Sequence, residues 1–320
     1  MRRAPVTRLP PVPRRSPSTD RDVRAASDGR VRLLTDADTP ALAALAARDP
    51  AVNVYVESVL EAGRLAGPCG GADGTLFLGV EDPARPGVLR SAVWVGSTVV
   101  PVAGHDDDVP ALAAAVASLR RRFASVYGPA GTVLPIGAAL RAAGHRPRAV
   151  REDQPLLVLG QGGPASADGA GPRVGVVPAT LEDLDAVLPA SAAMFEEELG
   201  FSPFLTGAAQ YRDRVRRMVA DGRVMHAPGR PVAGDPTSGV LFKADIGLLS
   251  SRCAQIQGVW LHPEHRGRGL AAPAMAEAVR LIARRAPLVS LYVNAFNTPA
   301  LRTYARAGFE QAGTFATVLY

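Results

Sequence analysis

The residues with the clearest chemical potential form a basic, glycine-rich turn, Arg266-Gly267-Arg268-Gly269, in the second half of the chain. Glycines let backbone N–H groups approach a ligand closely, and two guanidinium groups add whole positive charges. A helix predicted to begin near Leu270 or Ala271 adds the partial positive charge of its N-terminus. Together these features predict an anion-binding site, and a pyrophosphate is the ligand that such a turn fits best.

The elements on either side must hold this turn in place. An apolar, β-prone run over residues 256–261 predicts a strand, and His262-Pro263 ends it. The helix takes Pro273 in its first turn, where a missing N–H costs nothing, and is predicted to run to about Arg285. A dinucleotide-binding turn would instead place its first glycine against the strand and an acidic residue about twenty positions later. Residues 289–293 contain no acid, so this alternative is disfavoured.

The order Arg266-x-x-Gly269-x-Ala271 resembles the acetyl-CoA pyrophosphate motif of the GNAT superfamily of N-acyltransferases. A second signature, residues 292–309, resembles the GNAT segment in which a strand end, an asparagine and a tyrosine-bearing helix flank the CoA thioester. The two motifs stand in the family's order, and the resemblance covers residues 173–320.

The resemblance implies how acetyl-CoA would be bound. The pyrophosphate would be held by the side chains of Arg266 and Arg268 and by backbone N–H groups of the turn and helix start, namely Gly267, Arg268, Gly269, Leu270 and Ala271. The strand backbone at Val259 and Leu261 would pair with the pantetheine arm, as if the arm were an added strand. Asn297 would fix the following loop and contact the arm; it would also suit the N-cap of a helix.

Two further roles concern proton transfer. Tyr304 would protonate the departing CoA thiolate, since a thiol pKa of about 8.5 and a phenol pKa of about 10 are close enough for that transfer. Many relatives carry a glutamate base on the strand before the turn, but this sequence has glutamines there. The candidates elsewhere are Asp245 and the run Glu196-Glu197-Glu198, of which Glu197 represents the predicted catalytic carboxylate. A solvated helix face is the alternative interpretation of that run, and His262 and His265 are expected to be structural.

The length of 320 residues favours two domains. We predict a disordered Arg/Pro-rich tail over 1–28, a degenerate GNAT-like domain over 29–160, a linker over 161–172 and a catalytic GNAT domain over 173–320. The two halves repeat one order of elements. The predicted fold class is therefore α/β (α+β), with two tandem GNAT-like domains, each a mixed, mostly antiparallel sheet flanked by helices.

The first half lacks the residues that would bind the cofactor. Where the second half has its basic turn, the first has Gly104-His-Asp-Asp-Asp108, and Leu140 stands at the position of Tyr304. Three carboxylates ahead of a helix would cap it but repel a pyrophosphate. This half resembles the poorly characterised domain that precedes GNAT domains in proteins of high-GC bacteria, and it is predicted to have lost cofactor chemistry.

The charge and cysteine content exclude other classes of protein. Nine arginines and three aspartates in residues 1–32 supply the whole net charge of +6, so a basic nucleic-acid-binding core is not expected. The two cysteines, Cys69 and Cys253, form no disulfide framework and no metal-ligand spacing, which suits a reducing cytoplasm. No apolar run is long enough to span a membrane.

The sequence therefore predicts a cytoplasmic, metal-independent N-acetyltransferase that moves the acetyl group of acetyl-CoA directly to a primary amine. The acceptor is not identified: a small amine and a protein lysine both remain open. Mycothiol synthase has a comparable tandem plan, but no residue here is specific to a cysteinyl-sugar acceptor. The alternative from another class is a non-catalytic acyl-CoA-binding regulatory protein.

Overall fold

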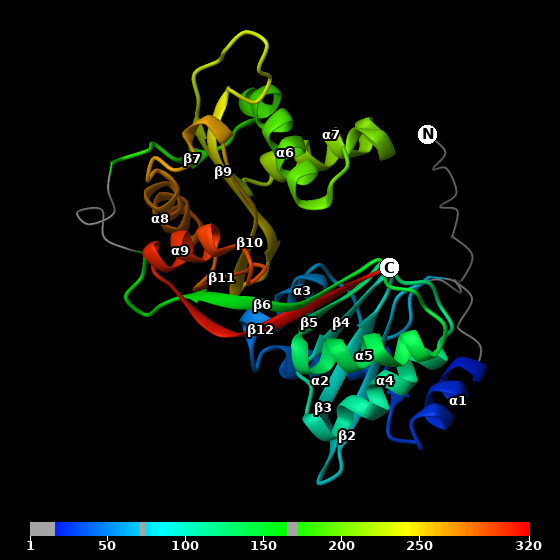
Figure 1. Ribbon diagram of the computed structural model, residues 1–320. Coiled ribbons are helices and arrows are strands. Elements are labelled where there is room, and N and C mark those ends of the chain that lie inside the picture. Colours follow the sequence, from blue (N-terminus) through cyan, green and yellow to red (C-terminus); the bar gives the residue numbers. More distant parts are fainter. Residues whose placement is uncertain (1–16, 71–73, 165–171) are drawn as a thin grey trace, which may run out of the picture. The chain divides into compact units, whose positions relative to one another are not determined.

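The computed structural model describes residues 17–70, 74–164 and 172–320 (Figure 1). It contains two compact units. The N-terminal unit comprises the described residues up to Val52, together with Val59–Glu152 and Ala316–Tyr320. The C-terminal unit comprises Asn53–Ser58 and Asp153–Phe315. Each unit combines a mixed sheet with packed helices, so the α/β fold class predicted from the sequence is confirmed.

The N-terminal unit is built on a sheet in the order β1-β2-β3-β4-β5, antiparallel except for the parallel pair β4–β5. Its strands are β1 (Arg32–Leu33), β2 (Leu76–Asp82), β3 (Arg85–Val95), β4 (Thr98–Val102) and β5 (Ser125–Pro129). Its helices are α1 (Pro17–Ala26), α2 (Thr39–Ala46), part of α3 (Pro50–Glu61), α4 (Val109–Ser118), α5 (Ala130–Ala142) and the short 3-10 turns η1 (Asp36–Asp38) and η2 (Asp106–Asp108). Leu112 and Val116 of α4 and Ile136 of α5 pack on the buried face of this sheet.

Helix α1 corrects the prediction of a disordered tail over 1–28. Val23 of this helix is fully buried in the N-terminal core, and Asp20 accepts the backbone N–H of Leu33 at 2.9 Å. One apolar residue among arginines and aspartates is too weak a periodic signal to predict a helix from sequence. Residues 1–16, where the rest of the predicted tail falls, lie outside the described part of the chain.

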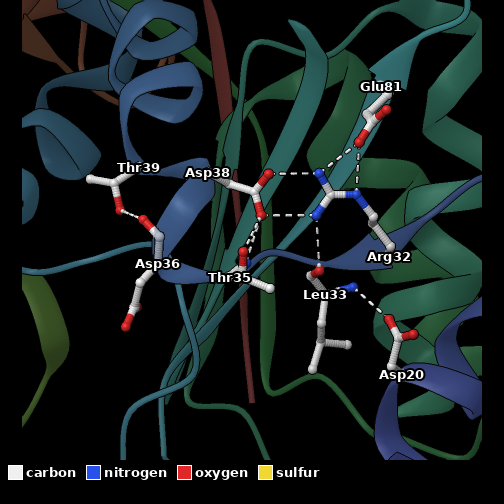
Figure 2. A network of polar contacts seen from close by, with 8 residues as sticks. All are labelled: Asp20, Arg32, Leu33, Thr35, Asp36, Asp38, Thr39 and Glu81. Atoms are coloured by element: carbon white, nitrogen blue, oxygen red, sulfur yellow. Dashed lines mark hydrogen bonds and ion pairs between the residues drawn. The ribbon is translucent and has the colours of Figure 1, made fainter. Parts of the chain in front are cut away.

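The segment after α1 is tied to the sheet by an arginine-centred network (Figure 2). The Arg32 guanidinium donates to both carboxylate oxygens of Asp38, at 2.9 and 2.6 Å, and to Glu81 Oε1. Asp38 in turn accepts the backbone N–H and hydroxyl of Thr35, which forms a capping box on η1. The Arg32 guanidinium holds the pKa of Asp38 down to about 2.

The C-terminal unit has a sheet in the order β6-β11-β10-β9-β8-β7, in which β10–β11 is the parallel pair. Its strands are β6 (Ala149–Leu159), β7 (Val177–Pro178), β8 (Val224–Pro228), β9 (Val240–Leu249), β10 (Cys253–Leu261), β11 (Leu288–Tyr292) and β12 (Phe309–Leu319). Its helices are α6 (Leu184–Leu199), α7 (Phe204–Ala220), α8 (Ala271–Ile282) and α9 (Thr298–Arg306), with 3-10 turns η3 (Leu181–Asp183) and η4 (Pro263–His265).

The helices of this unit cover both faces of the sheet (Figure 1). On α8, Met275, Val279 and Ile282 recur at helical spacing and are buried with the alternate β9 residues Phe242, Ala244 and Ile246. On the other face, α6 and α7 form a second cluster with Trp260. Because side chains alternate along a strand, Lys243 and Asp245 of β9 point to this second face. The predicted start of α8 at Ala271 and the place of Pro273 in its first turn agree with the structure.

The last strand of each sequence half crosses between the two units, which departs from the predicted boundaries of 29–160 and 173–320. β6 enters the C-terminal unit at Asp153, and its residues 156–158 pair with β11. β12 leaves that unit after Phe315, and Ala316 and Val318 are buried in the N-terminal core. Alternating apolar residues identify a strand but not the sheet that its backbone joins, so the sequence pattern cannot reveal this exchange. The predicted linker over 161–172 falls partly on residues outside the description.

No helix in the described ranges, 17–70, 74–164 and 172–320, is long and apolar enough to cross a membrane.

Candidate functional site

The turn between β10 and α8 has an open backbone. Gly267 and Gly269 both adopt positive φ, 74° and 75°, a conformation that side-chain-bearing residues rarely take. Apart from the glycine itself and its two neighbours in the chain, no described residue would lie within 4 Å of a Cβ built at either position. A ligand therefore has room to approach the backbone N–H groups of the turn and of the first turn of α8, where the helix dipole favours an anion.

Strands β10 and β11 separate just before this turn. Their parallel pairing runs from Cys253↔Leu288 only as far as Gln255↔Ser290. Beyond that point β10 continues to pair with β9, ending at Leu261↔Phe242, and β11 pairs with β6. Within the described residues, the stretch of β10 that contains Val259 and Leu261 thus has no strand partner on its β11 side. Such an edge can pair with the amide groups of an extended ligand.

Glu197 and Arg266 form an ion pair. Arg266 Nη2 donates to both oxygens of Glu197, at 2.8 and 2.9 Å, and Trp260 Nε1 donates to Glu197 Oε1 at 3.1 Å. Arg266 Nε also donates to the Leu261 carbonyl at 3.0 Å. Glu197 therefore links α6 to the end of β10 and to the basic turn, an arrangement that suits a positioning residue better than a base. Arg268 is exposed and forms no ion pair with any described residue.

A cavity of about 200 Å³ lies between α6, α7, β9 and β10. Of the three adjacent glutamates, Glu198 is the one that lines it. The remaining lining residues come from the facing helices and from β8, β9 and β10: Ser191, Met194, Phe195, Tyr211, Arg214, Val215, Met218, Val224, Asp245, Gly247, Gln257 and Gly258. Successive helical residues point about 100° apart, so the sequence alone does not show which glutamate reaches the cavity.

A buried ion pair forms one wall of the cavity. Lys243, the single lysine of the chain, is fully buried, and its Nζ donates to Asp245 Oδ2 at 2.7 Å and to the Gly258 carbonyl at 3.2 Å. The other oxygen, Asp245 Oδ1, is buried without a hydrogen-bond partner among the described residues. Burial raises the pKa of Asp245, while the Lys243 charge acts in the opposite direction.

Gly258 makes room for this pair. Its φ is +60°, and a Cβ built there would lie 2.8 Å from Asp245 Oδ2. The pairing of β10 with β9 shifts register between Gln257 and Trp260, so the strand bulges at this glycine. Asp245 was predicted from the sequence as a candidate base, but its partner Lys243 was not predicted. The signal was available, because two charged residues at alternate positions of an otherwise apolar strand must share one face.

Tyr304 is buried on α9, with 7% of its surface exposed, and its ring centroid lies 6.1 Å from that of Phe309. Burial, and then the negative charge of Glu198, raises the pKa of Tyr304. The phenol is therefore fully protonated at neutral pH and a weaker acid than free tyrosine, which makes the proton transfer predicted from ordinary pKa values less favourable.

The loop before α9 is held by two asparagines. Asn297 Oδ1 accepts the backbone N–H of Ala300 at 3.2 Å, so Asn297 is the N-cap of α9. Asn294 Oδ1 accepts Gln154 Nε2 at 3.0 Å. The loop is thereby fixed between β11 and α9. His262, which was predicted to be structural, is almost fully buried, and its Nε2 lies 2.9 Å from Asp235 Oδ2.

Carboxylates occupy the corresponding turn of the N-terminal unit. Asp108 is fully buried and accepts hydrogen bonds from Arg90, from Ser91 Oγ at 2.8 Å and from Arg30 at 3.0 Å. The expectation that these carboxylates cap the helix is wrong for Asp108: it forms no side-chain cap on α4 because its oxygens are taken by these donors. In the described part of the chain, no three His, Cys, Asp or Glu side chains are close enough together to hold a metal ion.

Two family models match parts of the chain. Residues 228–309 match the model of the acetyltransferase (GNAT) family, and residues 76–187 match a domain of unknown function, DUF4081. A comparison with curated proteins gave no match.

Three solved structures are similar along most of their length. A GCN5-related N-acetyltransferase from Sphaerobacter thermophilus is 19% identical, with a TM-score of 0.55 over 90% of this chain and 94% of its own. A Drosophila protein is 13% identical, with a TM-score of 0.56 over 91% and 98%. A GNAT-family acetyltransferase from Colwellia psychrerythraea is 10% identical, with a TM-score of 0.50 over 91% and 99%. At these identities the likeness concerns the fold. With the family match, it identifies the C-terminal part of the chain, over residues 228–309, as an acetyltransferase domain of the GNAT family.

Proposed function

We propose that the C-terminal unit binds acetyl-CoA and transfers its acetyl group directly to a primary amine. The observation that carries this proposal is the open glycine turn at the start of α8, directly after a β10 edge that β11 leaves unpaired. The family match supports acyl transfer as the reaction.

The described residues suit the parts of this substrate. Backbone N–H groups from Gly267 to Ala271 and the guanidinium of Arg268 would face the pyrophosphate, while Arg266 is held by Glu197. The pantetheine arm would extend along the free side of β10 at Val259 and Leu261. Amide groups there also provide hydrogen-bond donors for a polarised thioester carbonyl.

Tyr304 would donate its phenolic proton to sulfur as the carbon–sulfur bond breaks. Its protonated state at neutral pH suits a donor, and its raised pKa means that the proton moves only once negative charge has built up on the thiolate. The N-terminal unit, whose turn is occupied by Asp108, would not bind acetyl-CoA and would be a degenerate GNAT-like domain.

Calorimetric titration of acetyl-CoA into the full chain tests this function. We expect one site per chain, weakened about 10-fold or more by Arg268→Ala, since a hydrogen bond to a charged group contributes roughly 1.5–3 kcal/mol. Arg216→Ala, an exposed arginine on α7, is the matched control and should leave the affinity unchanged. Two equal sites would contradict the proposal that the N-terminal unit does not bind acetyl-CoA. Absence of binding would overturn the function, and binding without turnover of any amine would indicate a regulatory acyl-CoA-binding protein.

A further inference from the structure

We infer that Asp245, held by Lys243, accepts the proton of a small primary amine that binds in the cavity between α6, α7, β9 and β10. This inference rests on the proposed acetyl transfer and names the acceptor class and the base for that same site. It uses the cavity, the buried pair and the unpartnered oxygen, features that the acetyl-CoA site does not explain.

The unpartnered oxygen indicates what kind of group the cavity receives. Buried polar atoms are normally hydrogen-bonded, and a buried acceptor without a donor destabilises the fold. Lys243 occupies Asp245 Oδ2, and no described group donates to Oδ1, although Asp245 lines the cavity. An ammonium group carries three N–H donors and complements such an oxygen.

The size of the cavity favours a small acceptor. Its volume of about 200 Å³ is below the roughly 300–1,000 Å³ of sites for drug-sized ligands. An aromatic contact joins the two helices that form its outer wall, since the ring centroids of Phe195 on α6 and Tyr211 on α7 lie 5.9 Å apart. Phe201, in the segment between the helices, adds a second contact to Phe195 at 5.4 Å. An amine with few heavy atoms fits this enclosure better than a lysine presented by a folded protein.

The charged and titratable groups around Asp245 come from each neighbouring element. Lys243 lies beside it on β9, Arg214 and Tyr211 face it from α7, and Glu198 lines the cavity from α6. Burial raises the pKa of Asp245 and thus brings its basicity closer to neutral pH, which favours general-base catalysis. Glu197 is not available for this role because Arg266 and Trp260 occupy its oxygens.

The reaction then balances as follows. Asp245 Oδ1 takes one proton from the ammonium form of the acceptor, and the freed nitrogen lone pair forms a bond to the acetyl carbon. The carbon–sulfur bond breaks, and sulfur takes the phenolic proton of Tyr304. The second nitrogen proton returns to the Tyr304 oxygen, and Asp245 releases its proton to water. Each turnover yields an amide, free CoA and one proton.

The test measures CoA thiol release from acetyl-CoA by the full chain with ethanolamine, putrescine, glucosamine, free amino acids and a lysine-containing peptide as probes. We expect turnover of at least one small amine. Asp245→Asn should lower kcat/KM for that amine about 100-fold, the range for loss of a general base, with acetyl-CoA affinity unchanged. Glu196→Gln is the control, because Glu196 is exposed on α6 and does not line the cavity.

The pH profile separates a base from a merely structural residue. Asp245→Asn should remove the rise in kcat/KM that reports deprotonation of Asp245. Lys243→Met should move that rise to higher pH, because the Lys243 charge favours the carboxylate form of Asp245. If Asp245→Asn does not fold, the double variant Lys243→Met/Asp245→Leu removes both buried charges together, which is tolerated better than removing one. It should bind acetyl-CoA and not turn over.

Two results would overturn the inference while leaving acetyl transfer intact: turnover of the peptide alone, or full activity of Asp245→Asn. Acetyl-CoA binding without turnover of any probe would refute acetyl transfer as well. Failure to bind acetyl-CoA would instead refute the proposed function itself.

Discussion

The two units contain the same strand–turn–helix but use its charge differently. In each unit a helix with proline in its first turn, α4 with Pro110 and α8 with Pro273, follows a strand that also belongs to a parallel pair. Before α4, the buried carboxylate of Asp108 accepts hydrogen bonds from Arg30, Arg90 and Ser91. Before α8, Gly267 and Gly269 leave the backbone open.

Under the proposed function, one backbone arrangement serves stability in the N-terminal unit and binding in the C-terminal unit, depending on where the negative charge comes from. In the N-terminal unit the anion is part of the chain, so the cationic groups are already neutralised. In the C-terminal unit, under the proposed function, the anion would come from the bound ligand. The C-terminal turn is intermediate in this respect: Glu197 neutralises Arg266, whereas Arg268 forms no ion pair with any described residue.

Asp108→Asn should destabilise the N-terminal unit by about 2–3 kcal/mol, because the buried group loses its charge-assisted hydrogen bonds from Arg90 and Arg30. The chain has two tryptophans, Trp94 in the N-terminal unit and Trp260 in the C-terminal unit. Denaturant unfolding followed by Trp94 fluorescence in a Trp260→Phe background measures the effect. Asp107→Asn, at a side chain that is 75% exposed, should change stability by less than about 0.5 kcal/mol. Equal effects of the two variants would refute the claim that the Asp108 carboxylate stabilises the N-terminal unit by neutralising its arginines.

Gly269→Val should weaken acetyl-CoA binding about 100-fold. The substitution forces a β-branched residue into positive φ and fills the space through which the ligand approaches. Gly87→Val is matched to it, since Gly87 has φ +79° and open surroundings in the β2–β3 hairpin. It should cause a similar loss of thermal stability and leave acetyl-CoA affinity intact. Calorimetry and thermal unfolding distinguish these outcomes; weaker binding in both would point to a general effect of strain.

Glu197→Gln should strengthen acetyl-CoA binding about two- to fivefold. Arg266 and Glu197 are both about half exposed, so their pair contributes roughly 0.2–1 kcal/mol, and breaking it frees a positive charge for the pyrophosphate. Glu196→Gln makes the same change in net charge without touching Arg266 and serves as the reference. Weaker binding of the Glu197 variant would show that the carboxylate orients Arg266 instead of competing for it.

The Arg32–Asp38 pair should make the N-terminal unit lose stability as pH falls from about 4 to about 2. Asp38 has its pKa lowered from 3.8 to about 2 by the Arg32 hydrogen bonds, so the folded state favours its carboxylate form. That contribution is complete above the unfolded pKa and disappears as pH falls through the folded value; discounted for solvent exposure, it is about 1 kcal/mol. Trp94-monitored unfolding at each pH should show this slope, and Asp38→Asn should reduce it.

Much of the local structure of the proposed acetyl-CoA site could be predicted because its signals are local. Glycines at positive φ, a proline in the first turn of a helix and an N-cap asparagine each act through the nearby backbone, so Gly269, Pro273 and Asn297 identify the turn and the starts of α8 and α9.

The acceptor side could be predicted less well, because the spacing of Lys243 and Asp245 shows that they share one face of β9 but not that this face lines a cavity. Which glutamate faces the cavity depends on the rotation of α6 about its axis. The Lys243–Asp245 pair can be assigned to the cavity only once it is known which face of β9 lines it. The exchange of β6 and β12 depends on sheet partners far apart in sequence. The sequence therefore predicted the turn and helix starts of the proposed donor site better than the residues of the proposed acceptor site.

The burial of Lys243 has a consequence for the protein's own chemistry. Acetyl-CoA acetylates exposed lysines without a catalyst, and a protein that holds this reagent is a natural target. Here the single lysine is fully buried and its ammonium is bound by Asp245. No lysine ε-amine is therefore presented at the surface, and amine-reactive dyes or cross-linkers aimed at lysine should leave the folded protein unmodified at its side chains.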